Sequence, residues 1–416
     1  MPDTAPRRTL YRDAALADGR SDRLQHRMSL LVVDDLIVWI RPIDAEEDPL
    51  VGSAAAGGPD TDLEIVDAGG TTIVPGMVDG HSHLTMPGGS HWIERGDDPP
   101  EIAVATADRN AALMTQAGVR WARDVGSAVG RDPVDGRERA LSLGVRDRAR
   151  GRAAWPHIRA AGTWIGGPGA LGGLGVEAAD SDALVAAAEG QLDDGADFIK
   201  LYLDGADPMV CPWSVAEIER VVAAVHARGA RVTAHSGRID GARKGVAGGV
   251  DALEHGFELD DDVAREMARQ GTFLVSTLAV FRSWETFGTT TTIDRFTGPE
   301  GRARIAARRE RAEDSARIAH RAGVRIATGT DFGGGSTRAN QLAWEVESLV
   351  AAGLQPWEAL AAATWRGGEL LGEPDAGVLR DGGPADFFLV HGDPLSDPAS
   401  LWRVWRVSWS ADPVLI

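Results

Sequence analysis

Short apolar runs alternate with longer amphipathic stretches over most of this chain. Runs rich in β-branched and aromatic side chains, bounded by glycine, proline or charged residues, are typical of buried strands. Such runs recur eight times from residue 71 onward, at 71–83, 118–126, 157–163, 197–203, 230–237, 251–256, 272–280 and 324–331. These segments predict the strands of a sheet.

The stretches between these runs have the period of a helix. Residues 181–195 and 214–229 are two examples, and in the second the apolar side chains recur at helical spacing. Ser214 is expected to cap that helix together with Glu217, and Gly229 to end it. Strands that alternate with helices predict an α/β fold, and eight of them favour a parallel (β/α)8 barrel, the TIM barrel. An open doubly wound sheet is the alternative.

The two ends of the chain have a different pattern. Residues 1–72 and 373–416 contain short strands and turns, and a polar, glycine-rich spacer at 45–62 interrupts the first segment. We do not expect either end to form a domain by itself. We therefore expect both ends to form one small composite β-sandwich beside the barrel. The barrel would span residues 73–372.

Composition and charge narrow the class of partner. In 416 residues the chain has 43 Lys+Arg against 62 Asp+Glu, and the formal net charge of −19 argues against nucleic acid and membranes as partners. Residues 1–20 hold no apolar leader segment, and the single cysteine, Cys211, cannot form an intrachain disulfide. We expect a cytoplasmic protein that acts on a small-molecule or peptide substrate and could form a homo-oligomer.

Polar side chains stand at the carboxyl ends of the predicted strands, where a (β/α)8 barrel carries its catalytic groups. They are His81 and His83 in the first run, Lys200 in the fourth, His235 in the fifth, His255 in the sixth and Asp331 in the eighth. His81 and His83 are two residues apart, so both face the same side of a strand end. Imidazole and carboxylate groups gathered at one edge predict a metal site.

With these motifs the chain resembles the amidohydrolase superfamily. "PGMVDGHSHL" is similar to that superfamily's H-x-H signature, and "DFIKLY", "VTAHSGR", "DALEHG" and "GTDFG" match the order and context of its later ligands. The C-terminal "GGPADFFLVHGDPL" resembles part of its composite β-sandwich. Within the superfamily the chain looks similar to the imidazolonepropionase-like and Xaa-Pro dipeptidase-like hydrolases.

The resemblance implies a binuclear metal centre. In the family's binuclear members a strand-4 lysine is carboxylated by CO2 and bridges two cations, and here that lysine would be Lys200. One divalent ion would be held by His81, His83 and Asp331, and the other by His235 and His255. Zn²⁺ suits such a site, and Mn²⁺ or Co²⁺ would also fit. Without the carbamate, Lys200 would be a strand-end lysine paired with Asp204 or Asp331.

A centre of this kind implies a hydrolase. Two cations that share one water lower its pKa and give a bridging hydroxide, while one of them polarises the substrate carbonyl. Asp331 would take the proton of the hydroxide and pass it to the leaving amine. We therefore expect a metal-dependent amidohydrolase that cleaves a peptide-like or cyclic amide C–N bond, in a peptide or peptide-derived natural product, rather than an endopeptidase. Hydrolysis of an ester, lactone or carbamate is the alternative, and a non-catalytic metal-binding or NAD-dependent protein is a third class.

The glycine-rich segment 165–175 offers a competing motif. Within it, "GPGALG" at 167–172 matches the dinucleotide-binding pattern G-x-G-x-x-G. No helical pattern opens at the third glycine, so we interpret the segment as a flexible loop over the barrel mouth.

Weaker signals suggest where a substrate would bind. The stretch 281–300, after the seventh run, predicts a long loop of the kind that often forms a lid. The expected substrate contacts are Tyr202, Arg238, Trp284, Arg338 and His91. Aromatic and arginine side chains near the ligands would suit an aromatic or bulky apolar group with a carboxylate nearby.

Overall fold

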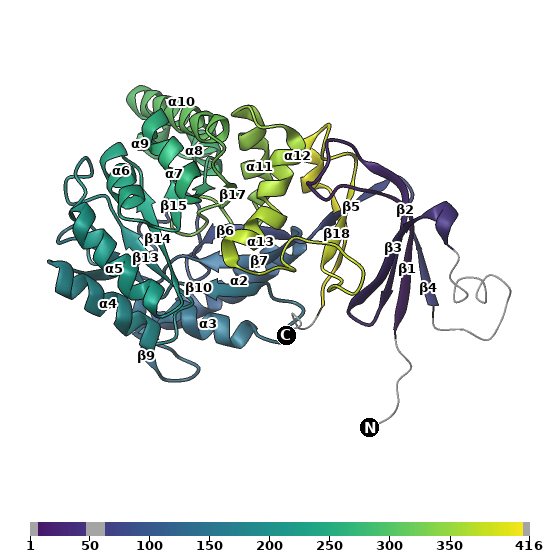
Figure 1. Ribbon diagram of the computed structural model, residues 1–416, viewed down its shortest axis with the longest axis horizontal. Coiled ribbons are helices and arrows are strands. Elements are labelled where there is room, and N and C mark those ends of the chain that lie inside the picture. Colours follow the sequence, from purple (N-terminus) through teal and green to yellow (C-terminus); the bar gives the residue numbers. More distant parts are fainter. Residues whose placement is uncertain (1–6, 47–62, 411–416) are drawn as a thin grey trace.

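The computed structural model describes residues 7–46 and 63–410 and has a mixed α/β fold (Figure 1). Two of its sheets consist entirely of parallel strands. The first has the order β10-β7-β6, formed by His157–Ala160, Val119–Asp124 and Met77–Ser82. The second has the order β12-β11-β13-β14-β15-β16-β17, formed by Val176–Glu177, Trp164–Gly166, Phe198–Tyr202, Arg231–Ser236, Ala252–His255, Phe273–Ser276 and Ile326–Thr328. The predicted α/β class is confirmed.

Two junctions bring these parallel sheets together. At the first junction the chain passes directly from one sheet to the other: β10 pairs with β7 in the first sheet, and the next strand, β11, pairs with β13 in the second. At the other end of the strand order, a parallel bridge joins Ser82 of β6 to Phe332, just beyond β17. Because the strands run parallel, their carboxyl ends lie at one edge, and the predicted ligands stand there.

Most helices lie on the outside of these strands (Figure 1). In α5 the buried side chains are Ile218, Val221, Val222 and Val225, and with the half-buried Val215 they make up the predicted apolar stripe. Ser214 and Glu217 form the expected capping box, and the helix ends at Ala227, two residues before Gly229. The helices are α2 (Pro100–Gln116), α3 (Leu141–Ala149), α4 (Ser181–Asp193), α5 (Val215–Ala227), α6 (Ile239–Ala247), α7 (Asp261–Gln270), α8 (Ala279–Thr290), α9 (Asp294–Thr297), α10 (Pro299–Arg321), α11 (Leu342–Ala351), α12 (Pro356–Ala362) and α13 (Trp365–Leu371).

Strands from both ends of the described chain share a third sheet. Its order is β19-β18-β5-β1-β2-β3, with β4 paired to β1. The strands are Val404–Ser408, Phe387–His391, Thr71–Pro75, Arg8–Leu16, Gln25–Val33, Leu36–Pro42 and, for β4, Leu63–Asp67. β18 runs antiparallel to β5, so the two ends hydrogen-bond directly. The smaller elements are β8 (Val129–Arg131), β9 (Glu138–Ala140), η1 (Ile43–Ala45) and η2 (Pro398–Trp402).

The run at 71–83, predicted as a single strand, is two strands in different sheets. It breaks at Gly76, so that β5 joins the sheet of the chain ends and β6 joins the parallel strands. A Cβ atom at Gly76 would lie 2.6 Å from Cβ of Arg120 and 3.0 Å from the ring of Trp409, so a larger residue would not fit at this crossing. The apolar pattern continues across the break because both strands are buried.

The segment 281–300, predicted as a long loop, is mostly helical. α8 and α9 span most of it, and α10 begins at its end. The buried carboxylate of Glu345 accepts a hydrogen bond from the backbone N–H of Ala279 at 2.6 Å, which holds the first turn of α8. The threonine-rich end of α8 conceals the helix in the sequence, because β-branched side chains lower helix propensity.

Part of the predicted organisation lies outside the described residues. The spacer at 45–62 is described only at its first two positions, and the N-terminal stretch only from residue 7 onward. Within the described ranges, no helix combines the length and the apolar character that a membrane crossing requires.

A buried ion pair fastens the sheet of the chain ends to the parallel strands. Nε of Arg120, on β7, lies 3.1 Å from Oδ1 of Asp386, directly before β18, and the arginine is fully buried. Arg120 also donates from Nη1 to the carbonyl of Trp155 at 2.7 Å, and Asp386 accepts from the backbone N–H of Ser410 at 2.8 Å. Removing one charge of this pair would leave the other buried and uncompensated.

Asp386→Ala should therefore lower the free energy of unfolding by about 3–5 kcal/mol, the usual penalty for breaking a buried ion pair. Chemical denaturation followed by circular dichroism measures the change. Asp262→Ala is the matched control, because Asp262 pairs with Arg265 at the surface and its loss should cost less than about 1 kcal/mol. Equal losses in the two variants would show that the buried pair does not hold the sheets together.

Candidate metal centre

The six predicted ligands line one cavity at the carboxyl ends of the parallel strands, with a volume of about 290 Å³. They are His81 in β6, His83 just after it, Lys200 in β13, His235 in β14, His255 in β15 and Asp331 beyond β17. His81, His83, Lys200 and His255 are buried. The structure thus brings together residues that lie as far apart in the chain as 81 and 331.

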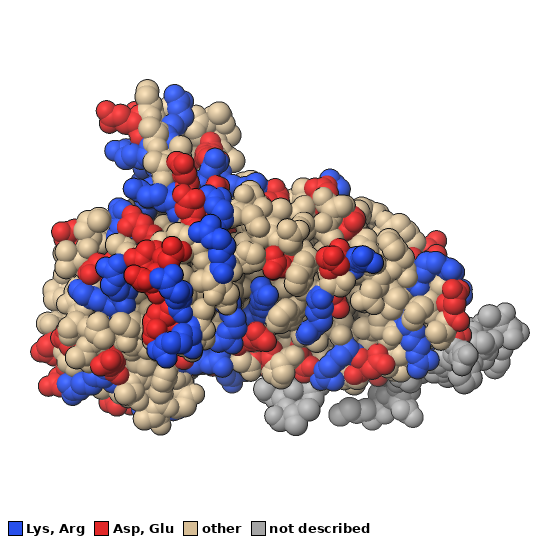
Figure 2. Space-filling model, turned by 45° about the horizontal axis from the view of Figure 1, so that its top comes forward, with Lys and Arg blue, Asp and Glu red and all other residues tan. Residues whose placement is uncertain are grey.

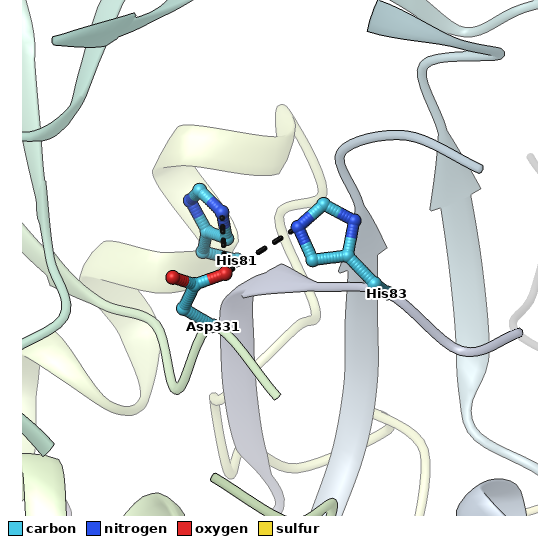
Figure 3. Close-up of side chains that lie close together, drawn as sticks. All are labelled: His81, His83 and Asp331. Carbon is cyan, nitrogen blue, oxygen red and sulfur yellow. Dashed lines mark ion pairs between the residues drawn. The ribbon is translucent and has the colours of Figure 1, made fainter. Parts of the chain in front are cut away.

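Three of the six are close enough to share one cation (Figure 3). Oδ1 of Asp331 lies 3.3 Å from Nε2 of His81 and 3.4 Å from Nε2 of His83. One possible ligand atom from each of the three residues lies within 4.8 Å of the other two. Two imidazole nitrogens and a carboxylate oxygen at this spacing suit a divalent ion such as Zn²⁺.

Hydrogen bonds behind the two rings hold Nδ1 of each, so that both Nε2 atoms face Asp331, where a metal would bind. Nδ1 of His83 lies 2.7 Å from the carbonyl oxygen of Gly126, and because a carbonyl only accepts, Nδ1 carries the proton. Nδ1 of His81 donates in the same way to Oε2 of Glu254 at 2.6 Å. A cation binds the form in which Nε2 has no proton and keeps its lone pair. Burial lowers the pKa of His81, but Glu254 and Asp331 raise it overall, so a bound cation would take the place of the Nε2 proton.

Glu254, which was not predicted as part of the site, is a fully buried carboxylate. Its Oε1 accepts hydrogen bonds from Nη1 of Arg123, at 2.6 Å, and from the hydroxyl of Thr233. Burial alone would raise the pKa of Glu254, but Arg123 and Lys200 hold it well below its usual range. The carboxylate is therefore ionised and fixes the ring of His81. Its signal in the sequence is an acid directly before a predicted ligand, in an otherwise apolar strand.

Lys200 is buried and its amine has no hydrogen-bond partner within the described residues. The ion pairs with Asp204 or Asp331 that the sequence left open are not formed. Oδ2 of Asp204 instead accepts from the backbone N–H of Gly237 at 3.1 Å. Burial lowers the pKa of Lys200 to about 8, so part of the amine is neutral near pH 7. Only two of the 43 Lys+Arg residues are lysines, the other being Lys244.

His235 and His255 form another wall of the cavity. Their ring centroids are 4.6 Å apart, and the ring of His255 is also 4.6 Å from that of His81. Burial and the neighbouring imidazoles hold the pKa of His255 well below its usual range, so this ring is neutral. Nε2 of His235 lies 3.2 Å from Oδ2 of Asp204, and its ring stacks on Tyr202 with centroids 4.0 Å apart. Asp204 is thus a further carboxylate at the site.

Two of the six residues have a left-handed backbone. φ is 68° at His255 and 53° at Asp331, a region that residues other than glycine rarely adopt. Such a conformation costs on the order of 1–3 kcal/mol and persists where the surrounding structure holds it. The backbone N–H of Asp331 donates to the carbonyl of His81 at 2.8 Å, which ties one of the two to β6.

Aromatic side chains and an arginine complete the cavity, which is also lined by Trp92, Trp164, Tyr202, Phe257, Trp284 and Arg308. Of the predicted substrate contacts, Tyr202 and Trp284 are in this lining. The other three lie outside it: Arg238 is paired with Glu258, Arg338 is exposed beside Gly89, and His91 is exposed next to Glu94. Nothing in the sequence distinguishes Arg308 from the other arginines of α10, so its place could not be predicted.

The glycine-rich segment 165–175 borders the same cavity through Ala170, Leu171 and Leu174. It consists of β11 and turns, and the next helix, α4, opens only at Ser181. The helix that a dinucleotide-binding loop requires at its third glycine is therefore missing from this segment.

Comparisons with known proteins agree with this geometry. Residues 72–408 match the Amidohydrolase family. An uncharacterized protein of Mycobacterium tuberculosis is 31% identical over 395 residues, which cover 92% of this chain and 93% of that protein. The ochratoxinase of Aspergillus niger is 28% identical over 237 residues, which cover 52% of this chain and 46% of that protein.

The fold itself recurs in solved structures. A Xaa-Pro dipeptidase with bound methionine superposes with a TM-score of 0.79 at 24% identity, covering 97% of this chain and 98% of that one. The A. niger ochratoxinase superposes with a TM-score of 0.76 at 20% identity, covering 98% of this chain and 95% of that one. At identities of 24% and 20%, these superpositions show a shared fold and nothing more.

Glu254→Gln removes the charge that holds Nδ1 of His81 but keeps the shape of the side chain. We expect the affinity of the site for Zn²⁺ to fall about tenfold to a hundredfold, the usual effect of losing a carboxylate behind a coordinating histidine. Competition with a chromophoric chelator measures the affinity. Glu258→Gln is the matched control, because Glu258 pairs with Arg238 outside the cavity lining. Equal Zn²⁺ affinities in the two variants would contradict the orienting role of Glu254.

Proposed function

We propose, because this chain belongs to the amidohydrolase family, that it is a metal-dependent hydrolase of an amide C–N bond. The proposed substrate is a peptide-like or cyclic amide, in a peptide or a peptide-derived natural product. The name of the family, which refers to the hydrolysis of amides, favours amide chemistry.

The proposed architecture is a (β/α)8 barrel with a composite β-sandwich built from both chain ends. The two junctions between the parallel sheets support a closed barrel, and the sheet shared by β1 to β5, β18 and β19 supports a composite domain. Because β5 belongs to that sheet, we move the proposed boundary from residue 73 to the break at Gly76.

The observation that carries the proposal is the buried, unpartnered amine of Lys200 among imidazoles and carboxylates. A permanent ammonium ion at this place would be costly, because it lacks a hydrogen-bond partner. A neutral amine can add to CO2, so that a new N–C bond forms, one N–H proton leaves to solvent and an anionic carbamate remains. The carbamate offers two oxygens, which suits it to bridging two cations.

The donor set fits a binuclear centre. One divalent ion, most simply Zn²⁺, would be held by His81, His83 and Asp331, and a second by His235 and His255, with the Lys200 carbamate between them. The neutral ring of His255 and the ionised Asp331 are the forms that such ions require, and a cation would take the place of the Nε2 proton of His81. When bound, the ions lower the pKa of a coordinated water and polarise the carbonyl of the amide.

Asp331 is the proposed proton-transfer residue. Burial alone would raise the pKa of its carboxyl, but the charge of His81 and hydrogen bonds from His81 and His83 hold it well below its usual range. The ionised carboxylate can accept a proton from the attacking water and deliver it to the leaving nitrogen as the C–N bond breaks. The oxygen of the water stays on the acyl carbon, so the products are a carboxylic acid and an amine.

Lys200→Ala tests the carbamate and with it the proposed function. Wild-type protein supplied with ¹³C-bicarbonate should show one carbamate carbon by NMR and bind two divalent ions per chain. The variant should lose that signal, at least one ion and most of its amide hydrolysis. Short carboxylic acids should partly restore turnover, because they can stand in for the missing oxygens.

Lys244→Ala is the matched control for that experiment, since Lys244 is the only other lysine and pairs with Asp240 at 3.0 Å. It should keep the ¹³C signal, both ions and the activity. Wild-type turnover and metal content in Lys200→Ala would exclude the carbamate.

Asp331→Asn should separate proton transfer from metal binding. The amide keeps the shape and one oxygen of the carboxylate but cannot accept a proton at neutral pH. We expect most of the metal to be retained and kcat to fall on the order of a hundredfold or more, the usual scale of general acid–base catalysis. KM should change little, because binding a neutral amide hardly needs the carboxylate. Full metal together with near-normal kcat would assign the proton transfer to another group.

A further inference from the structure

A second cavity, with a volume of about 300 Å³, adjoins the cavity of the metal centre. Trp92, Trp284 and Arg308 line both, so the two spaces share one wall. Phe296, from α9, bounds the second cavity farther out. We call Trp92, Trp284 and Phe296 the aromatic groove.

The aromatic groove presents flat apolar faces. The rings of Trp92 and Trp284 are nearly parallel, with centroids 6.0 Å apart and 20° between their planes, and Phe296 lies 6.1 Å from Trp92. Both tryptophans are partly exposed, and the guanidinium of Arg295 lies over the ring of Trp92, 4.8 Å from its centroid. Aromatic walls of this kind suit a flat or bulky apolar group.

Arg308 brings a positive charge to the junction of the two cavities. Its guanidinium lies 5.4 Å from the ring centroid of Trp284, and within the described residues no carboxylate pairs with it. Two nearby arginines are neutralised, since Arg309 pairs with Glu285 at 2.5 Å and Arg238 with Glu258 at 2.7 Å. Arg295 and Arg304 also line the second cavity and form no ion pair among the described residues, but of these cations only Arg308 lines both cavities. Arg308 is thus a cation at the cavity wall that makes no close ion pair among the described residues, while Glu258 and Asp204 act on it from a greater distance.

The charge of Arg308 opposes that of the whole molecule. A chain with a net charge of −19 repels anions at long range, so holding an anion at its cavity requires a local cation. Figure 2 shows such local variation, since a run of blue side chains descends from the projecting part of the molecule across a face where red side chains are frequent. The planar guanidinium fork matches the two oxygens of a carboxylate.

We propose that Arg308 is a specificity-determining residue that binds a carboxylate on the part of the substrate held by the aromatic groove. This inference rests on the proposed function and names its substrate class. The substrates are amides in which the nitrogen-bearing half is aromatic or bulky and carries a free carboxylate, as in N-acylated aromatic amino acids. The carboxylate pairs with Arg308, the apolar group lies against Trp92 and Trp284, and the amide reaches the metal centre.

Two ligands isolate the carboxylate. N-benzoyl-L-phenylalanine and N-(2-phenylethyl)benzamide share the amide and both rings, and only the first has a carboxylate. Their binding is measured by calorimetry on metal-loaded protein in the Asp331→Asn background, which suppresses turnover. We expect the acid to bind at least about tenfold more tightly than the neutral amide, as a charge-assisted hydrogen-bond pair implies.

Arg308→Met should abolish that preference, because it removes the charge and keeps the apolar stem over Trp284. Binding of the neutral amide should be unchanged. Arg302→Met is the matched control, since Arg302, like Arg308, is an exposed arginine of this helix but lies outside both cavity linings. It should keep the preference for the acid.

Three results would overturn the inference: equal binding of the two ligands by the parent protein, a preference that survives in Arg308→Met, or no binding of the acid at all. Hydrolysis is assayed separately on protein with Asp331 intact. Binding that follows the expected pattern without any hydrolysis would count against the proposed amide hydrolysis and leave the role of Arg308 standing.

Discussion

The buried carboxylate of Glu254 is the interaction on which the cavity depends. A charge in a protein interior is costly unless it is paired and fully hydrogen-bonded. Here the partners come from three other strands: His81 of β6, Arg123 of β7 and Thr233 of β14. The same contacts that stabilise the charge also set the ring of His81 against Asp331. The carboxylate of Glu254 therefore contributes both to the packing of the strands and to the geometry of the candidate centre.

The residues of the candidate centre could be predicted from the sequence, whereas the contacts that support them could not. Polar residues at the ends of apolar runs could be recognised because parallel strands place their carboxyl ends at one edge. Glu254 contacts Arg123 and His81 across 131 and 173 positions, a separation about which local periodicity says nothing. Arg308 was equally hidden, because its neighbours in α10 include several other arginines and only the tertiary fold selects one of them for the cavity.

The two errors in the predicted elements have the same physical origin, because in both places the structure is decided by contacts with residues far away in the sequence. A continuous apolar run signals burial but not the sheet in which a strand is buried, so the crossing at Gly76 could not be located. The first turn of α8 is held by Glu345, 66 positions from Ala279, so a tertiary contact overrides the weak helix propensity of a threonine-rich segment. The predicted α/β class is correct despite both errors, because it rests on many strands and helices and does not depend on any one of them.

The left-handed backbone at His255 and Asp331 has an evolutionary consequence. Glycine would relax either position, yet it would remove a side chain of the candidate centre. Selection for stability alone would thus favour losing these side chains, and their presence in a strained conformation marks a balance between folding and function. In a descendant that no longer needed the candidate centre, these two positions would be the first to change to glycine, and the fold around them would gain stability.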